Sequence, residues 1–181
     1  MSHSLVPTRK VAERIVMEIL HLPILVHEID IAGSIRRERP FVGDIDLVIK
    51  LEQKSDITAV LQRMAVNCKL IKNGEQYVVF EMSNGLQIDL WFAHPAIPAK
   101  KDMFGVVEVE AQPSNYGSLL LCRTGSKEHN IFIAQRAQSL GMSWQTSRGI
   151  VQAGRVIASE TEQDIFKALN LDYIAPERRE R

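Results

Sequence analysis

Three aspartates are the residues best suited to carry chemistry. Asp44 and Asp46 lie two positions apart in the run Asp-Ile-Asp-Leu-Val-Ile-Lys-Leu, and Asp89 lies within Leu-Gln-Ile-Asp-Leu-Trp-Phe. Residues i and i+2 of a strand point to the same face, so the first two carboxylates share a face while Ile45 points into the core. Neighbouring carboxylates in apolar strands are costly to desolvate unless cations compensate them. Oxygen ligands without Cys or His nearby favour Mg²⁺ or Mn²⁺ over zinc.

A glycine-serine stretch with two arginines precedes the acid pair. Gly33-Ser34 is followed by Arg36 and Arg37, and Gly43 stands directly before the first aspartate. Glycine lets the backbone approach a ligand, and the following N–H groups with a serine hydroxyl can hold phosphate oxygens. Arginine guanidinium groups bind phosphates through pairs of parallel hydrogen bonds. A phosphate cradle beside metal-binding acids predicts a nucleoside triphosphate site and two-metal phosphoryl transfer, with the ions ~3.5–4 Å apart.

Each of these signals alone is weak. A single Asp-x-Asp is more often an edge or turn feature, and Gly-Ser before arginines is more often a plain loop. Their joint occurrence, with a third aspartate embedded in a later strand, is the nucleotidyltransferase pattern.

The elements that must position these residues form an α+β pattern. Asn84-Gly85 between two alternating runs is a strong hairpin signal. Strands are expected at 25–32, 44–51, 75–82 and 86–92, helices at 8–20, 56–65, 115–122, 127–140 and 160–169, and a small hairpin at 150–157. We expect a mixed or antiparallel nucleotidyltransferase-type sheet (palm) with helices on one side, over residues 1–105. A small, mostly helical lobe with a β-hairpin is expected over 106–181, because prolines and lysines mark a boundary within 93–105.

Composition sets the broad class. The chain has 181 residues, is 45% hydrophobic and 24% charged, and carries 22 basic and 22 acidic residues. These values are typical of a globular protein and exclude a disordered or fibrous chain. Cys68 and Cys122 form no disulfide framework or zinc spacing, and no signal peptide or membrane-length run is visible. We therefore expect a soluble intracellular monomer with no membrane partner.

The zero net charge by itself argues against nucleic acid as a partner, but where the charged residues lie matters more than their sum. Three of the acids are candidate metal ligands, and arginines cluster at 36–39 and 178–181. Local positive electrostatic potential, and not net charge, attracts the phosphates of a nucleic acid.

The sequence resembles a family X DNA polymerase of the DNA polymerase beta-like group. The resemblance rests on the active-site motif at 33–46, on Thr-Gly-Ser-Lys-Glu-His-Asn at 124–130, and on the C-terminal motifs at 160–166 and 171–179. It extends over about residues 25–180.

This resemblance implies template-directed addition of dNTPs to a primer 3′-hydroxyl, in short-gap filling during DNA repair, with two Mg²⁺ or Mn²⁺ ions. Asp44 and Asp46 would bridge both ions, and Asp89 would bind the catalytic ion. The partners implied are primer-template or gapped DNA and dNTPs. The resemblance also implies that the lobe over 106–181 binds nucleotide and DNA. The nucleotide-binding residues implied are Gly33, Ser34, Arg37, Gly43, Cys122, Arg123, Thr124, Gly125, Ser126, Lys127 and Asn130. Candidate DNA contacts are Arg36, Lys100, Lys101, His129 and Arg136.

The sequence departs from the family pattern at several points. Cys122 and Arg123 stand where the family usually has two aromatics against the nucleotide sugar, which indicates either a local repacking or relaxed discrimination between dNTPs and rNTPs. Gln87 stands where an arginine often steers the third acid. About 24 residues precede the catalytic lobe, so we expect no lyase or helix-hairpin-helix domain and no 5′-deoxyribose-phosphate lyase activity.

Two alternatives stay open at this point. One is a template-independent nucleotidyltransferase acting on RNA, a protein or a small molecule. The other is a non-catalytic module that binds DNA ends. The three aspartates argue against the second, and the polymerase-like C-terminal motifs argue against the first.

Overall fold

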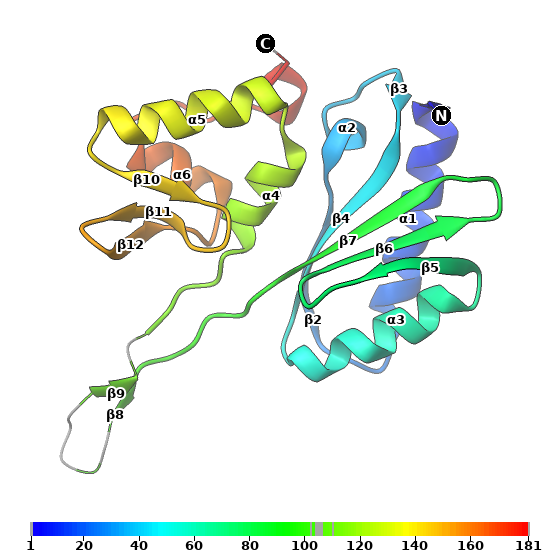
Figure 1. The fold of residues 1–181 in the computed structure, drawn as a ribbon, viewed down its shortest axis with the longest axis horizontal. Coiled ribbons are helices and arrows are strands. Elements are labelled where there is room, and N and C mark those ends of the chain that lie inside the picture. The colour runs from blue at the N-terminus through cyan, green and yellow to red at the C-terminus, as the bar shows by residue number, and fades with distance from the viewer. Residues whose placement is uncertain (1, 102, 104–106, 110, 181) are drawn as a thin grey trace.

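The N-terminal half folds around one mixed sheet, shown in the computed structural model of Figure 1. The structure describes residues 2–101, 103, 107–109 and 111–180. The sheet has the order β2-β4-β7-β6-β5, in which β4 and β7 are parallel and the other pairs are antiparallel. Its strands are β2 (Val26–Ile31), β4 (Asp44–Leu51), β7 (Gln87–Ala93), β6 (Tyr77–Met82) and β5 (Cys68–Asn73).

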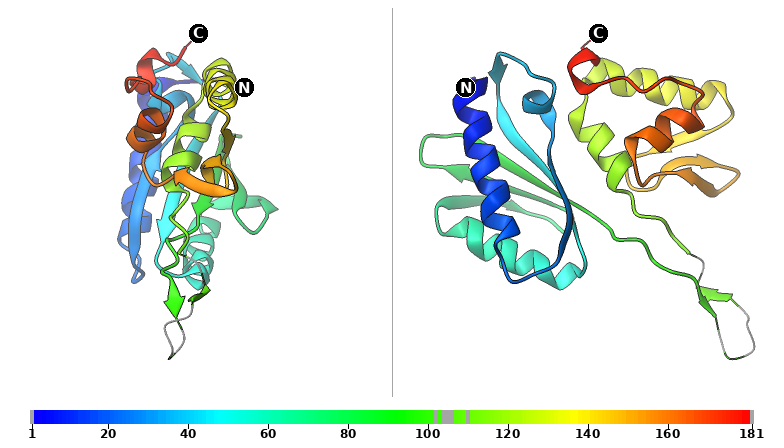
Figure 2. Two further views of the ribbon diagram at one scale, coloured as in Figure 1. Left: turned by 90° about the vertical axis from the view of Figure 1, so that its left-hand side faces the viewer. Right: turned by 180° about the vertical axis from the view of Figure 1, so that it is seen from behind.

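Helices α1 (Leu5–Leu20) and α3 (Ile57–Ala65), the latter preceded by the short turn η1 (Lys54–Asp56), cover one face of this sheet (Figure 2). The face is apolar because alternate residues of β4 point toward it. Ile45 and Leu47 are fully buried against the helices. The intervening residues of β4, the two predicted acids among them, therefore point to the opposite face.

Short elements flank the start of β4. β1 (His3–Ser4) pairs with β3 (Phe41–Val42), and α2 (Gly33–Arg36) is a single helical turn where the sequence predicts only a loop. Gly33 has a φ of +61°, and a Cβ added to it would lie 2.1 Å from Oδ2 of Asp46. Glycine is therefore required here both by its backbone conformation and by its contact with the acid.

Beyond β7 the chain runs outward and returns as two adjacent segments (Figure 1). These segments pair through β8 (Lys100–Lys101) and β9 (Val107–Val109) and through a bridge between Ile97 and Gln112. The projection lies where the sequence indicates a lobe boundary.

The C-terminal lobe has its own core. Its helices pack around buried Leu121, Ile133, Ile150, Ile165 and Phe166. Three antiparallel strands form its sheet, one more than the predicted hairpin. The elements are α4 (Tyr116–Thr124), α5 (Lys127–Ser139), β10 (Ser143–Gln145), β11 (Gly149–Gln152), β12 (Arg155–Ala158), α6 (Glu162–Ala168) and η2 (Pro176–Arg178).

Helix α4 joins the lobes by packing on the second face of the large sheet. Its residues Tyr116, Leu119 and Leu120 are buried against Val48 and Ala93 of β4 and β7. The predicted α+β class and the helices on one side of the palm sheet are confirmed. Within the described ranges, no helix is both long and apolar enough to cross a membrane.

Candidate active site

The three predicted aspartates lie on the sheet face that the C-terminal lobe covers. Asp46 of β4 stands directly opposite Asp89 of β7, and Asp44 stands opposite Gln87. Burial, together with the negative charges of Asp44 and Asp89, raises the pKa of Asp46 to about 7. Burial also raises the pKa of Asp89. The acids therefore form a group of like charges that a cation would relieve.

The donor set fits hard divalent ions, because it consists of carboxylate oxygens on adjacent strands. In the described part of the chain, no three carboxylate, imidazole or thiol side chains converge closely enough to surround an ion as they stand. Two of the carboxylates are instead held by hydrogen bonds from aromatic residues.

Those aromatic residues form a stacked pair beside the acids. The Tyr77 hydroxyl donates to Oδ2 of Asp89 at 2.8 Å, and the Trp91 indole N–H donates to Oδ1 of Asp46 at 3.2 Å. The two rings are stacked with centroids 3.7 Å apart. The Arg123 guanidinium lies over the other face of the Trp91 ring, 3.4 Å from its centroid. The sequence analysis assigned no role to this pair, because only the strand register places the two rings together.

Three predicted nucleotide-binding residues present buried polar atoms that lack a hydrogen-bond partner among the described residues. These atoms are Ser34 Oγ, Arg123 Nε and Asn130 Oδ1. Nδ2 of Asn130 donates to the carbonyl of Cys122 at 2.8 Å. Unpaired polar atoms in native structures call for a ligand, a water or an ion.

The two arginines after the glycine-serine stretch lie between the lobes. Arg36 donates to both carboxylate oxygens of Glu162, at 2.8 and 2.9 Å, and to the hydroxyl of Thr124. Arg37 donates to Glu180 and to the carbonyl of Thr124. These bonds bring the predicted phosphate loop against the predicted Thr-Gly-Ser segment.

That segment connects α4 to α5. Ser126 caps α5 by accepting from the His129 N–H at 3.2 Å, and its hydroxyl donates to the Arg179 carbonyl at 2.7 Å. Gly125 has a φ of +70°, and a Cβ there would meet Arg37 Nη1 at 3.2 Å. Lys127 is exposed at the start of α5. The structure thus brings the two predicted nucleotide-binding segments together.

The candidate DNA contacts are scattered. His129 is fully buried near Phe132 and Phe166, and the Arg136 guanidinium donates to the Leu169 carbonyl at 2.9 Å. Arg36 is engaged with Glu162, as described above. Of these three side chains, His129 is buried, whereas Arg36 and Arg136 are partly buried and bonded within the protein, so their contact with DNA stays a prediction.

The two lysines of the candidate DNA contacts lie in the projecting segment. Lys100 is exposed, and the side chain of Lys101 lies outside the described residues.

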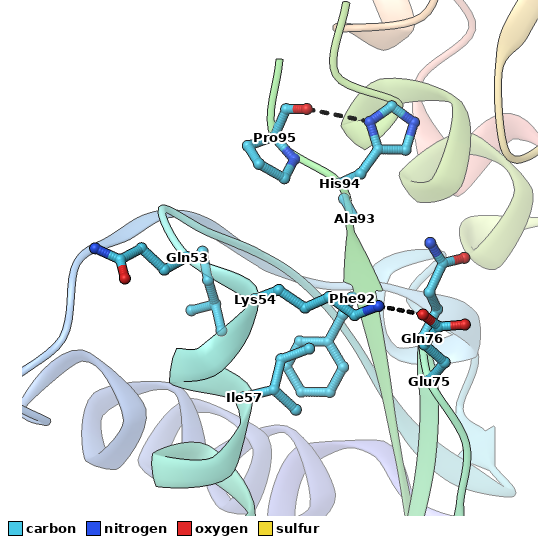
Figure 3. Close-up of a pocket in the computed structure, with 10 residues that line it drawn as sticks. Gln53, Lys54, Ile57, Glu75, Gln76, Phe92, Ala93, His94 and Pro95 are labelled. Atoms are coloured by element: carbon cyan, nitrogen blue, oxygen red, sulfur yellow. Dashed lines mark hydrogen bonds and ion pairs between the residues drawn. The ribbon is translucent and has the colours of Figure 1, made fainter. Parts of the chain in front are cut away.

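A separate small pocket lies at the far ends of β4 and β7 (Figure 3). It has a volume of about 160 Å³, and an ion pair between Lys54 and Glu75 lies on its lining. Ile57 and Phe92 supply apolar walls. No predicted site residue lines it, whereas the acids lie toward the start of β4.

Comparisons with known proteins bear on the C-terminal lobe and on the overall fold. The family model described as DNA polymerase beta thumb matches residues 119–180. Two solved structures of Leishmania infantum polymerase beta resemble the whole chain. The ternary P/T complex matches with a TM-score of 0.71 and 17% sequence identity, over 77% of its own chain. The ternary gap complex matches with a TM-score of 0.76 and 16% sequence identity, over 71% of its own chain. This chain is covered over 100% in both. No curated protein matches it.

At these identities the solved structures establish the fold, which is that of polymerase beta. The C-terminal lobe also matches the polymerase beta thumb model, so the chain resembles polymerase beta in fold and in its thumb region.

Proposed function

We propose that the chain is a template-directed DNA polymerase that adds dNTPs to a primer 3′-hydroxyl by two-metal nucleotidyl transfer, in short-gap filling. The observation that carries the proposal is the position of Asp46 opposite Asp89, on the sheet face that meets a polymerase beta-type thumb. Two strands of the palm and the loop at Gly33 thereby enclose one polar site.

Each residue has a defined part in this proposal. Asp44, Asp46 and Asp89 would hold Mg²⁺ or Mn²⁺. The bound ions would lower the pKa of the primer hydroxyl and neutralise charge on the phosphates. The 3′-oxygen attacks the α-phosphate in line, and pyrophosphate leaves. Catalysis then consists mostly of positioning and charge neutralisation.

The phosphate loop supplies the remaining contacts. The Ser34 hydroxyl, which has no partner in the described residues, would donate to a terminal phosphate oxygen. Nη2 of Arg37 would donate to the same phosphates, because the hydrogen bonds of Arg37 to Glu180 and Thr124 use Nε and Nη1. Asn130 would lie along the minor-groove edge of the incoming base. These contacts would hold the triphosphate between the two lobes.

One primer-extension experiment tests the proposal. The purified chain is given gapped, recessed and single-stranded DNA with each dNTP, in Mg²⁺, Mn²⁺ or EDTA. We expect templated, metal-dependent addition that Asp89→Ala abolishes, whereas Asp172→Ala, which removes an exposed carboxylate, retains it. Addition without a template would identify a transferase instead, and DNA binding without extension would identify an end-binding module.

A further inference from the structure

We propose that Tyr77 is a positioning residue for Asp89, and that its stacked partner Trp91 positions Asp46 in the same way. This inference rests on the proposed function. It goes beyond it by assigning the orientation of the carboxylates to two residues outside the acidic motif.

The sheet register explains why both aromatic residues reach the acids. Tyr77 of β6 is paired with Trp91 of β7, whereas Asp89 lies two residues earlier in β7 on the same face. Tyr77 is therefore diagonal to Asp89, a separation that an aromatic side chain spans. Trp91 is likewise diagonal to Asp46, because Asp46 pairs with Asp89 across β4 and β7.

The hydrogen bonds use one oxygen of each carboxylate. Tyr77 donates to Oδ2 of Asp89, and Trp91 donates to Oδ1 of Asp46. A donor fixed on one oxygen sets the rotation of the carboxylate and leaves the other oxygen for a ligand. Outer hydrogen bonds of this kind orient metal-ligating groups and stabilise their charged form.

Cations hold the two rings in place. Arg123 lies 3.4 Å from the centroid of Trp91, and the Lys72 ammonium lies 4.6 Å from that of Tyr77. The rings themselves are nearly parallel, with planes 11° apart. A stack closed at both ends by cations restricts the rotation of each ring. The hydroxyl and the indole N–H are consequently kept pointed at the acids.

The position two residues before Asp89 in β7 is occupied by Gln87, which is uncharged, so the strand of Asp89 offers no cation there to orient it. Gln87 is exposed and pairs with Asp44 in the register of the sheet. The donor that steers Asp89 comes instead from the neighbouring strand, through Tyr77.

The test compares Tyr77→Phe with the parental chain. The substitution keeps the ring stacked on Trp91 and removes only the donor. We expect kcat for primer extension to fall by about 10-fold to 100-fold, with the KM for dNTP unchanged. We also expect Mn²⁺ affinity, measured by electron paramagnetic resonance without DNA or nucleotide, to weaken by about 10-fold.

Two further variants make the result specific. Tyr173→Phe removes a comparable hydroxyl-to-carboxylate bond, 3.0 Å long, to Glu162 in the other lobe, and should leave Mn²⁺ affinity unchanged. Tyr77→His retains a planar ring with an N–H donor and should recover part of the affinity that Tyr77→Phe loses. Thermal unfolding of each variant confirms that it is folded.

The outcomes separate the two proposals. Parental Mn²⁺ affinity in a folded Tyr77→Phe variant overturns the role of Tyr77, whatever the activity. Absence of extension by the parental chain overturns the proposed function, while weakened Mn²⁺ binding in Tyr77→Phe would still support the positioning role. If Tyr77→Phe does not fold, Tyr77→His decides. Its ring N–H can still donate to Asp89, so a folded His variant without any Mn²⁺ affinity contradicts the idea that a donor at this position sustains metal binding.

Discussion

Arg36 of the palm and Glu162 of the C-terminal lobe form a two-bond ion pair across the lobes, at 2.8 and 2.9 Å. Arg179, which is fully buried, binds the same carboxylate at 2.6 and 3.1 Å. One acid thus satisfies two guanidinium groups, and its loss would leave Arg179 as a buried charge without its partner.

Glu162→Gln should destabilise the protein by about 3 kcal/mol, because breaking a buried ion pair on one side leaves the other charge uncompensated. Urea unfolding at neutral pH measures the change. Glu13→Gln, at an exposed position of α1, is the matched control and should leave the unfolding free energy unchanged. An equal stability of the two variants would contradict the linking role of Glu162.

The same pair should make stability depend on pH. Burial acts to raise the pKa of Glu162, but hydrogen bonds from Arg179 and Arg36 outweigh it and hold the pKa below the usual 4.5. A group whose pKa is lower in the folded state stabilises it above the unfolded pKa, and this contribution is lost as the pH falls through the folded value. The stability difference between the parental chain and Glu162→Gln should therefore shrink below pH 4.5. Urea unfolding from pH 7 to pH 3 follows it, and a constant difference would contradict the expectation.

Asp46→Asn should abolish extension and yet stabilise the metal-free protein by about 1–2 kcal/mol, because it removes one of three like charges while Oδ1 still accepts from Trp91. Thermal unfolding in EDTA measures the gain. Adding Mg²⁺ should raise the Tm of the parental chain more than that of the variant. A less stable variant in EDTA would show that repulsion among the acids is not significant.

Gly33→Ala should destabilise the protein by about 1–3 kcal/mol, because the residue has a positive φ and its new methyl group would collide with the Asp46 carboxylate. Gly43→Ala is the matched control for stability, since a Cβ there meets no atom within 4 Å. Urea unfolding of both variants decides the point. Equal stability would mean that the loop moves away from Asp46 without cost.

Ribonucleotide discrimination should be weak, because Cys122 and Arg123 replace the aromatic pair expected against the sugar. Arg123 is turned to the Trp91 ring, and the Cys122 thiol accepts a hydrogen bond from Thr146. Single-nucleotide incorporation of dGTP and rGTP measures the ratio, and Cys122→Tyr should raise the preference for dGTP. A strong preference in the parental chain would contradict the expectation.

The alternation of β4 and β7 was enough to predict the three aspartates and the shared face of Asp44 and Asp46, since a period of two is a local property. The register that sets Asp46 opposite Asp89, and Tyr77 beside Trp91, depends on long-range pairing that no local pattern contains. Strand β5 was missed because it is an exposed edge strand whose sequence, Cys-Lys-Leu-Ile-Lys-Asn, does not alternate regularly between polar and apolar residues.

The roles of the two arginines show the same limit. Residue type alone indicated phosphate contacts for Arg36 and Arg37. The partner of Arg36 lies 126 positions away in the sequence, so only the three-dimensional structure, which brings the start of α6 close to α2, reveals the ion pair. Charge pairing between distant segments depends on tertiary structure and leaves no signal in the neighbouring residues.

The contact between Arg123 and Trp91 also gives the molecule an optical reporter. Trp91 belongs to the palm sheet, whereas the guanidinium on its ring comes from the last turn of α4. The chain has two tryptophans, and Trp144 lies within the C-terminal lobe, bonded to Ser118. Any separation of the lobes would therefore change the surroundings of one indole and leave the other unaltered. In a Trp144→Phe background, the emission of Trp91 would follow lobe movement during nucleotide binding without an added dye.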